Sequence, residues 1–439
     1  MQVKLGLKEN WRQFTLLVII NAFVGGMVGL ERSILPRIAE AEWRIAAKSA
    51  ILSFIIVFAI VKAITNYFTG ALANKTGRKN LLTIGWLIGI PVPFVLMFAG
   101  SWSWIVAANV LLGINQGLTW SSTVVMKIDL IGERQRGFAM GLNEFSGYVA
   151  VAVVAFLTGW VASKYGLRPY PFYIGVVLSL LGFFGSWLLV KDTKHHVAAE
   201  ITTSKVPRLK NIFLDTTLRN KNLSAVTQAG LVNNLNDGMA WGILPILLAS
   251  KGFGIEEIGV VTAVYPAVWG IGQLFTGKMA DHFCKKDMLF LGMLLQGIAL
   301  IVLVFAQTLM HFIILSSVLG IGTALVYPTF LATVADNTHP SDRAKSIGVF
   351  RLWRDSGYAI GAVLTGIIAD AFGINASILT IGFITIFSAG VIWFRMNCGS
   401  NYAVKLFGWL QHDKKKYNLP GILNLAKRRL DCSIHLPLA

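Results

Sequence analysis

The chain has 439 residues, of which 55% are hydrophobic and only 14% are charged, and its mean hydropathy is +0.64. A soluble protein of this length needs a much larger polar surface, so the composition excludes that class and indicates an integral membrane protein. The formal net charge of +18 would suit nucleic-acid binding only if the basic residues gathered on one folded surface.

Apolar runs long enough to cross a bilayer follow one another along the chain, and short polar segments separate them. Each spanning helix needs about 20 such residues. The first run lacks a small-residue cleavage site and leads directly into further runs, so we expect an anchor and not a removable signal peptide. We predict twelve spans, at residues 14–36, 48–70, 81–99, 102–126, 138–162, 171–190, 223–249, 257–279, 288–307, 311–335, 347–369 and 376–396.

The basic residues are divided unequally between alternate loops. Most of the 39 Lys and Arg residues lie on the side that holds both termini and the segment 191–222. By the positive-inside rule we expect that side to be cytoplasmic, in a plasma (inner) membrane. Contact with anionic lipids then explains the net charge, and we expect no nucleic-acid partner. The opposite loops hold only Arg37, Arg44, Lys48, Lys164, Arg168 and Lys251.

The two halves of the chain repeat each other. At a constant offset of 207 residues, Gly70 answers Gly277, Asp129 answers Asp336, Arg136 answers Arg343 and Gly141 answers Gly348. Parallel repeats around a central site characterise one class of secondary transporters. We therefore predict an all-α membrane protein with a six-helix bundle at 1–190, a cytoplasmic linker at 191–222, a second six-helix bundle at 223–396 and a basic amphipathic cytoplasmic tail at 397–439.

The loop after the second span carries a recognisable motif. "GALANKTGRK" at 70–79 resembles the loop 2–3 signature of the major facilitator superfamily, and "GKMADHFCKK" at 277–286 resembles a weaker second copy. "RQRGFAMGL" at 134–142 is similar to the loop 4–5 pattern of the same family. The resemblance covers about residues 10–396. It implies two six-helix bundles, related by a pseudo-twofold axis along the membrane normal, that rock around a central cavity.

The resemblance also implies a set of conformational-switch residues. Family members usually have an acid at position 74, where it caps a helix of the other half. Asn74 can still accept a hydrogen bond there but lacks the charge, worth about 0.3–1 kcal/mol. Arg78 and Asp129 match a basic and an acidic position of the family, so we expect them to form a latch. The other switch residues are Gly70, Gly77, Lys79, Asp281 and Arg136, which match the family motifs, and Arg343, which answers Arg136 in the repeat.

Two features depart from the drug/proton antiporters of this superfamily. These often have an Arg in span four, where this chain has Gly113, and a Gly-Pro pair in span five, where "GLNEFSGYVAVAV" has none. The departures leave the predicted fold unchanged but weaken the prediction of an antiporter.

Charged residues inside the predicted spans mark the candidate site, since each costs roughly 2.5–3.5 kcal/mol at a span centre. There are four of each sign, which suggests mutual pairing and a zwitterionic or neutral solute. The predicted solute- or proton-binding residues are Asp237, Glu31, Arg32, Glu144, Asn233, Trp241 and Arg354. Lys62, Arg351 and Asp355 are assigned to the conformational switch, with Lys62 and Asp355 forming an ion pair between the halves in at least one state.

Simpler structural roles stay open for several of these residues. Glu31 and Arg32 could form a self-neutralising structural pair, and Lys62 with Asp355 a static strut. Glu144 suits gating or a structural role as well as proton binding. Asp237 has no obvious local cation, so we favour a proton or solute site there. Two or three of the aromatic residues Trp120, Tyr265, Trp269, Tyr327 and Trp353 are expected to line the cavity.

Other chemistry is not indicated by the sequence. It contains no phosphate-binding GxxxxGK[ST] loop, no HExxH, no nucleophile elbow and no metal-type cysteine spacing, so we expect no enzyme activity, cofactor or metal. We predict a monomeric secondary transporter of a small organic solute, coupled to protons, with efflux favoured over uptake. Proton symport or facilitated uptake is the alternative, and a non-transporting sensor of transporter fold is a minor one.

Overall fold

The computed structural model describes residues 4–32, 34–45, 48–133 and 135–398. Within these ranges the regular secondary structure is helical, and no β-strand is present. The predicted amphipathic tail falls almost entirely on residues 399–439, which lie outside the described residues.

The first bundle is formed by the helices up to residue 189. Its third span is broken in two because Pro91 starts a new helix, where its missing N–H costs no hydrogen bond. The bounds are α1 (Trp11–Arg32), α2 (Leu35–Trp43), α3 (Lys48–Thr76), α4 (Arg78–Gly89), α5 (Pro91–Phe98), α6 (Trp102–Ile131), α7 (Arg136–Tyr165) and α8 (Tyr173–Phe184), with a 3-10 turn at Tyr170–Phe172 and a π-helical turn at Gly185–Leu189.

The linker and the second bundle follow. The linker contains α9 (Lys194–Ile201), α10 (Ile212–Leu214) and a π-helical turn at Asp215–Arg219. The second bundle contains α11 (Lys221–Gly242), α12 (Leu244–Ser250), α13 (Ile255–Met279), α14 (Lys285–Leu303), α15 (Leu309–Asp336), α16 (Pro340–Phe372) and α17 (Ile374–Arg395).

The twelve-helix architecture predicted from the sequence is confirmed. Nine helical segments of the described chain are long and apolar enough to cross a membrane, and α6, α11 and α16 complete the twelve. These three helices carry many of the buried polar and charged side chains. Helix α16 begins at Pro340, well before the predicted start at residue 347, with His339 as its cap and a proline at its first position. Arg343 therefore lies within the helix and is buried.

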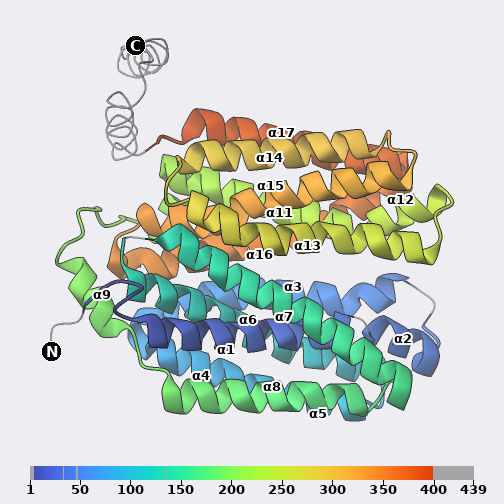
Figure 1. Ribbon diagram of the computed structural model, residues 1–439, viewed down its shortest axis with the longest axis horizontal. Coiled ribbons are helices and arrows are strands. Elements are labelled where there is room, and N and C mark those ends of the chain that lie inside the picture. Colours follow the sequence, from blue (N-terminus) through green and yellow to red (C-terminus); the bar gives the residue numbers. More distant parts are fainter. Residues whose placement is uncertain (1–3, 33, 46–47, 134, 399–439) are drawn as a thin grey trace, which may run out of the picture. The chain divides into compact units, whose positions relative to one another are not determined.

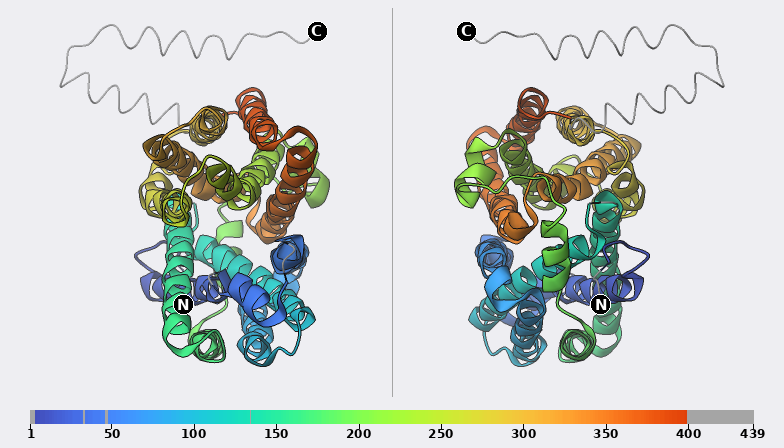
Figure 2. Two further views of the ribbon diagram at one scale, coloured as in Figure 1. Left: turned by 90° about the vertical axis from the view of Figure 1, so that its right-hand side faces the viewer. Right: turned by 90° about the vertical axis from the view of Figure 1, so that its left-hand side faces the viewer.

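The two bundles repeat one packing scheme. Helix α1 packs on α7 as α11 packs on α16, and α3 packs on α6 as α13 packs on α15. Figure 1 shows the first bundle in the lower half and the second in the upper half, with α9 at one end. The bundles meet where α3 contacts α16 and where α7 contacts α13. The linker crosses the end that carries α9 from the first bundle to the second, in front of both bundles in the right-hand view of Figure 2.

Glycines make the contact between the bundles close. A Cβ added to Gly70 of α3 would lie 2.4 Å from the carbonyl oxygen of Ala344 and 2.9 Å from the Cα of Gly348. A Cβ on Gly141 of α7 would lie 3.0 Å from the Cα of Gly277 on α13. Because Gly70 corresponds to Gly277 and Gly141 to Gly348 in the repeat, the same helix contact occurs twice.

Candidate functional site

The linker supplies an acid that joins the two bundles. Glu200 of α9 is buried, and its Oε1 lies 2.6 Å from Nη2 of Arg136 and 2.6 Å from Nη2 of Arg343. Arg343 also donates from Nη1 to Oε2 at 2.7 Å. Since Arg136 and Arg343 are equivalent in the repeat, Glu200 lies at the axis that relates the bundles. We call the end of the bundles that carries this contact the basic end.

Further ion pairs surround Glu200. Nη1 of Arg136 lies 2.8 Å from Oδ1 of Asp336, at the end of α15 in the other bundle. Oδ2 of Asp129 lies 3.4 Å from Nε of Arg78, and its Oδ1 lies 3.7 Å from Nη1 of Arg343. The two residues that the resemblance assigned to a latch are thus in contact, and Asp129 also reaches the other bundle. Their action as a latch stays a prediction.

An acid from the second bundle caps a helix of the first. Asp281 accepts hydrogen bonds from the N–H groups of Gly137 at 2.7 Å and Phe138 at 2.9 Å, in the first turn of α7. Such a carboxylate satisfies N–H groups that have no partner within the helix, and it opposes the positive end of the helix dipole. Partial burial nevertheless raises the pKa of Asp281, against the lowering effect of the two N–H donors.

Asn74 occupies the equivalent place in the other half, but its hydrogen bond runs in the opposite direction. Its Nδ2 donates to the carbonyl oxygen of Ser341 at 2.6 Å, whereas the sequence suggested that Asn74 accepts from helix N–H groups. The start of α16 has little need of an acceptor. Pro340 has no N–H, and the N–H of Ser341 donates to Nδ1 of His339.

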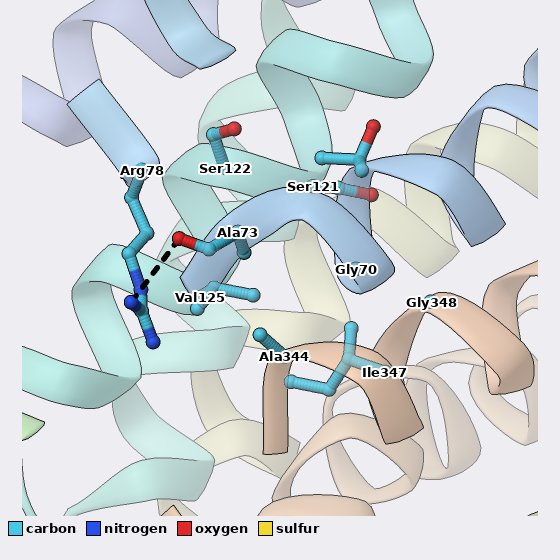
Figure 3. Close-up of a pocket in the computed structure, with 10 residues that line it drawn as sticks. Gly70, Ala73, Arg78, Ser121, Ser122, Val125, Ala344, Ile347 and Gly348 are labelled. Carbon is cyan, nitrogen blue, oxygen red and sulfur yellow. Dashed lines mark hydrogen bonds between the residues drawn. The ribbon is translucent and has the colours of Figure 1, made fainter. Parts of the chain in front are cut away.

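The first loop motif has a backbone role as well. Gly77 has φ of +91°, a conformation that L side chains rarely adopt, and it turns the chain into α4. The backbone N–H of Lys79 donates to Asp192 at 3.0 Å. Arg78 donates from Nη1 to the carbonyl oxygen of Ala73 at 3.3 Å, beside a small pocket between the bundles (Figure 3). This pocket is lined by Thr69, Gly70, Ala73, Arg78, Ser121, Ser122, Val125, Ala344, Ile347 and Gly348.

Nearer the middle of the helices, a hydrogen-bonded chain crosses the interface of the bundles. Asp355 lies 2.6 Å from Nη2 of Arg354, its neighbour on α16, and accepts from Nδ2 of Asn66 on α3 at 2.6 Å. Asn66 accepts from Oγ of Ser121 on α6 at 2.5 Å. Ser121 in turn accepts from Nη1 of Arg351 at 3.2 Å, so the chain returns to α16.

Glu144 on α7 is the second buried acid of this region. Its Oε1 accepts from Nδ2 of Asn143 at 2.7 Å and from Nε1 of Trp120 at 3.3 Å, and lies 3.8 Å from Nη2 of Arg351. Lys127 donates to Oδ1 of Asn143 at 2.5 Å. Lys127 lies one residue beyond the predicted fourth span, but α6 runs to Ile131 and buries it.

Lys62 takes a position different from the one predicted for an ion pair. Its Nζ lies 5.2 Å from the ring centroid of Trp120 and 5.6 Å from that of Phe58. Among the described residues no carboxylate lies within salt-bridge distance of it, and Asp355 binds Arg354 instead. Lys62 and Asp355 still interact electrostatically at longer range. An ion pair between them in another state remains a prediction.

Aromatic rings from both bundles meet around Tyr148. Its ring centroid lies 4.1 Å from that of Trp269, 5.6 Å from that of Trp120 and 6.0 Å from that of Tyr327. Trp353 lies elsewhere and donates from Nε1 to Thr217 in the linker. We call Trp120, Tyr148, Trp269, Tyr327 and Tyr265 the aromatic cluster. Tyr148 was missed in the sequence, although it stands one helical turn after Glu144 and shares its face.

Asp237 contacts the aromatic cluster through Tyr265. It is 3% exposed and accepts a hydrogen bond from the hydroxyl of Tyr265, which also lies 3.1 Å from Oγ1 of Thr323. Asn233 is fully buried, and neither of its amide atoms has a hydrogen-bond partner within the described chain. Trp241, at the end of α11, is 45% exposed and does not join the buried residues.

Glu31 lies apart from these groups. It is buried on α1 and lines a small pocket with Phe54, Phe58 and Asn109, among others, towards the end opposite the basic end. The side chain of Arg32 lies outside the described residues, so the predicted Glu31–Arg32 pair has no structural description.

Two equivalent six-helix bundles, with buried charges between them and ion pairs that join them at one end, define a multi-pass membrane transporter. The family model of the Major Facilitator Superfamily matches residues 14–225 and again residues 226–407. The chain belongs to that superfamily, whose members are transporters and not enzymes.

Individual relatives are more distant. The chain is 22% identical over 395 residues to the multidrug resistance protein MdtG of Escherichia coli strain SMS-3-5, a match that covers 88% of this chain and 94% of that protein. MdtG of strain UMN026 matches at 22% over 402 residues with the same coverage. The crystal structure of the human organic anion transporter MFSD10 superposes with a TM-score of 0.71 at 14% identity, covering 87% of this chain and 99% of that one. This last likeness concerns the fold.

Proposed function

We propose that the chain moves a small organic solute by alternating access and couples efflux of the solute to proton entry. The observation that carries the proposal is the group of buried charges that both bundles contribute at their interface. Burying Arg351, Arg354, Glu144 and Lys127 between the helices is costly, and in membrane proteins such residues mark solute and ion paths. Ion pairs close the basic end in this conformation, and the other state would break them.

The proposal places the basic end in the cytoplasm. The excess of Lys and Arg in its loops supports that orientation, and anionic lipid head groups would attract the same residues. On this proposal the protein lies in the inner membrane, and both of its termini face the cytoplasm. The conformation described here is, on this proposal, closed towards the cytoplasm.

Asp237 is the acid that we propose for proton coupling. It is buried, it contacts the hydroxyl of Tyr265, and no basic side chain of the described chain lies within salt-bridge distance of it. An acid that is held by a neutral partner in a buried place can change its charge as the site opens to one side or the other. Arg354 is near enough to interact with it electrostatically.

The support for the direction of transport comes from relatives of the chain and not from its structure. The relatives named for multidrug resistance favour efflux, at 22% identity. One contact favours the alternative of proton symport or facilitated uptake. A Cβ on Gly113 would lie 3.0 Å from the carbonyl oxygen of Phe58 and from Cβ of Val61, so α3 leaves no room for the Arg that related antiporters often have there.

Everted membrane vesicles energised by respiration test both parts of the proposal. A panel of organic solutes is added, and the pH gradient is followed with a fluorescent weak base. A solute exchanged for protons collapses the gradient in vesicles that contain the chain and leaves it intact in vesicles that contain Asp237→Asn. Uptake that ignores the pH gradient would support facilitated diffusion. If the protein is folded but moves no solute of the panel, the result would favour a non-transporting sensor of transporter fold.

A further inference from the structure

We infer that the centre between the bundles binds an organic anion. Its anionic group would lie between Arg351 and Lys62, and its flat apolar part against the aromatic cluster. The inference rests on the proposed function, because it assigns a solute class to the same site. It is carried by hydrogen-bond donors that the protein leaves open, by acids that are already held by other groups, and by the rings beside them.

Arg351 offers an open pair of donors. The residue is fully buried, and its guanidinium makes one hydrogen bond, from Nη1 to Ser121 at 3.2 Å. Its Nε and Nη2 have no hydrogen-bond partner among the described residues, and the nearest carboxylate oxygen, of Glu144, is 3.8 Å from Nη2. Nε and Nη2 form one edge of the guanidinium. This edge binds a carboxylate or sulfonate through two parallel hydrogen bonds.

Lys62 brings a second positive charge from the other bundle. The rings of Trp120 and Phe58 attract its ammonium group but do not neutralise it. No salt bridge or hydrogen bond to Lys62 is found within the part of the chain that the structure describes. A solute anion that touched both Lys62 and Arg351 would therefore attract α3 and α16 to each other, which is the kind of differential contact that can bias a two-state carrier.

The acids of the centre are already occupied. Asp355 binds Arg354 and Asn66, Glu144 binds Asn143 and Trp120, and Asp237 binds Tyr265. With these acids held by groups of the protein, the open donors of the centre belong to Arg351 and Lys62. Open donors on two basic side chains favour an anion over the neutral or zwitterionic solute that the sequence suggested.

The aromatic cluster suits a flat apolar group. Trp120 and Tyr148 come from the first bundle, and Trp269 and Tyr327 from the second, with Tyr148 and Trp269 only 4.1 Å apart. Nε1 of Trp269 is buried and has no hydrogen-bond partner among the described residues. Rings of this kind attract a flat ring by stacking or edge contacts.

Binding of three probes of one shape to the full-length chain in nanodiscs tests the inference. The probes are 2-naphthoate, neutral 2-naphthamide and cationic 2-naphthylmethylammonium, and calorimetry gives the Kd of each. We expect naphthoate to bind at least about tenfold more tightly than the other two, a difference of about 1.4 kcal/mol. Arg351→Gln and Lys62→Gln should each remove most of that preference. Lys164→Gln, which neutralises an exposed lysine outside the site, should leave it unchanged.

Three results would overturn the inference: equal binding of the amide or the ammonium probe, no naphthoate binding at millimolar concentration, or a preference that survives both substitutions. Lys62 is half-buried, so Lys62→Gln still tests the site if Arg351→Gln does not fold. Selective naphthoate binding without transport in liposomes would refute the proposed function and leave the anion site standing. Transport of neutral or cationic solutes without any anion preference would support the proposed function and refute the anion site.

Discussion

Glu200 binds Arg343 through both carboxylate oxygens, at 2.6 Å to Nη2 and 2.7 Å to Nη1. The same carboxylate lies 2.6 Å from Nη2 of Arg136 in the other bundle. Two buried guanidinium groups that share one carboxylate would repel each other, and the linker acid between them weakens that repulsion. The linker is therefore a working part of the contact that joins the bundles at the basic end, as well as a connection between them.

Replacing Glu200 should open the basic end. Glu200→Gln leaves two buried arginines short of a negative charge, and loss of one member of a buried ion pair costs about 3–5 kcal/mol in the state that contains it. We expect faster amide hydrogen exchange at the starts of α7 and α16, measured on the intact chain by mass spectrometry. Glu133→Gln is the control, because it neutralises an exposed acid in the loop before α7. Equal exchange in both variants would contradict a joining role for Glu200.

The cap made by Asp281 should depend on pH. Burial raises the pKa of this carboxyl above its ordinary value, so the folded state binds the proton more strongly than the unfolded chain does. The contribution of Asp281 to stability is then greatest at low pH and declines as pH rises from the ordinary carboxyl range through the raised pKa. The Tm of the wild type relative to that of Asp281→Asn should fall over this interval. A difference in Tm that is constant or grows with pH would contradict this.

How much the sequence could predict depends on the repeat. The repeat identified Arg136 and Arg343 as equivalent positions, because each half contains one copy. Glu200 occurs once, in a polar linker, and nothing in its neighbourhood distinguishes it from a solvated acid. The direction of the Asn74 hydrogen bond could not be predicted either, since it depends on how His339 and Pro340 already complete the start of α16.

Gly70 should tolerate no side chain. In Gly70→Ala the new Cβ would lie 2.4 Å from the carbonyl oxygen of Ala344, so α3 and α16 would have to separate. Overpacking of this kind costs typically about 1–3 kcal/mol. Transport should fall strongly and exchange at the basic end should rise. Gly270→Ala in α13 is a matched control, because a Cβ there meets nothing within 4 Å. Transport by Gly70→Ala at the rate of the control would show that the close approach is dispensable.

Asp237→Asn should uncouple solute transport from the proton gradient. The amide keeps the size of the side chain but cannot exchange a proton, so gradient-driven accumulation should be lost while solute binding and counterflow continue. Tyr265→Phe is the matched variant. It removes the hydroxyl that Asp237 binds and should shift the pH profile of transport without abolishing the coupling. Unchanged pH-driven transport in Asp237→Asn would exclude this acid as the coupling group.

Lys62 and Asp355 should pair in the state that opens the basic end. In the present conformation Asp355 binds Arg354 and Asn66, and Lys62 lies over Trp120. Movement of α3 against α16 would change these distances. After Arg354, Lys62 is the opposite charge that acts most strongly on Asp355, and Asp355 is the one that acts most strongly on Lys62. Asp355→Lys alone removes the acid that pairs with the buried Arg354, at a cost of about 3–5 kcal/mol, and Lys62→Asp alone sets a second acid towards Asp355, so each single change should disable transport.

The double variant Lys62→Asp with Asp355→Lys restores opposite charges across the interface and should recover part of the transport rate. The coupling energy is the difference between the effect of the double change and the sum of the two single effects. Lys164→Asp with Asp355→Lys is a control, since the exposed Lys164 offers no such partner and should give no recovery. Losses that simply add in the Lys62–Asp355 double variant would show that the two residues act independently in every state of the cycle.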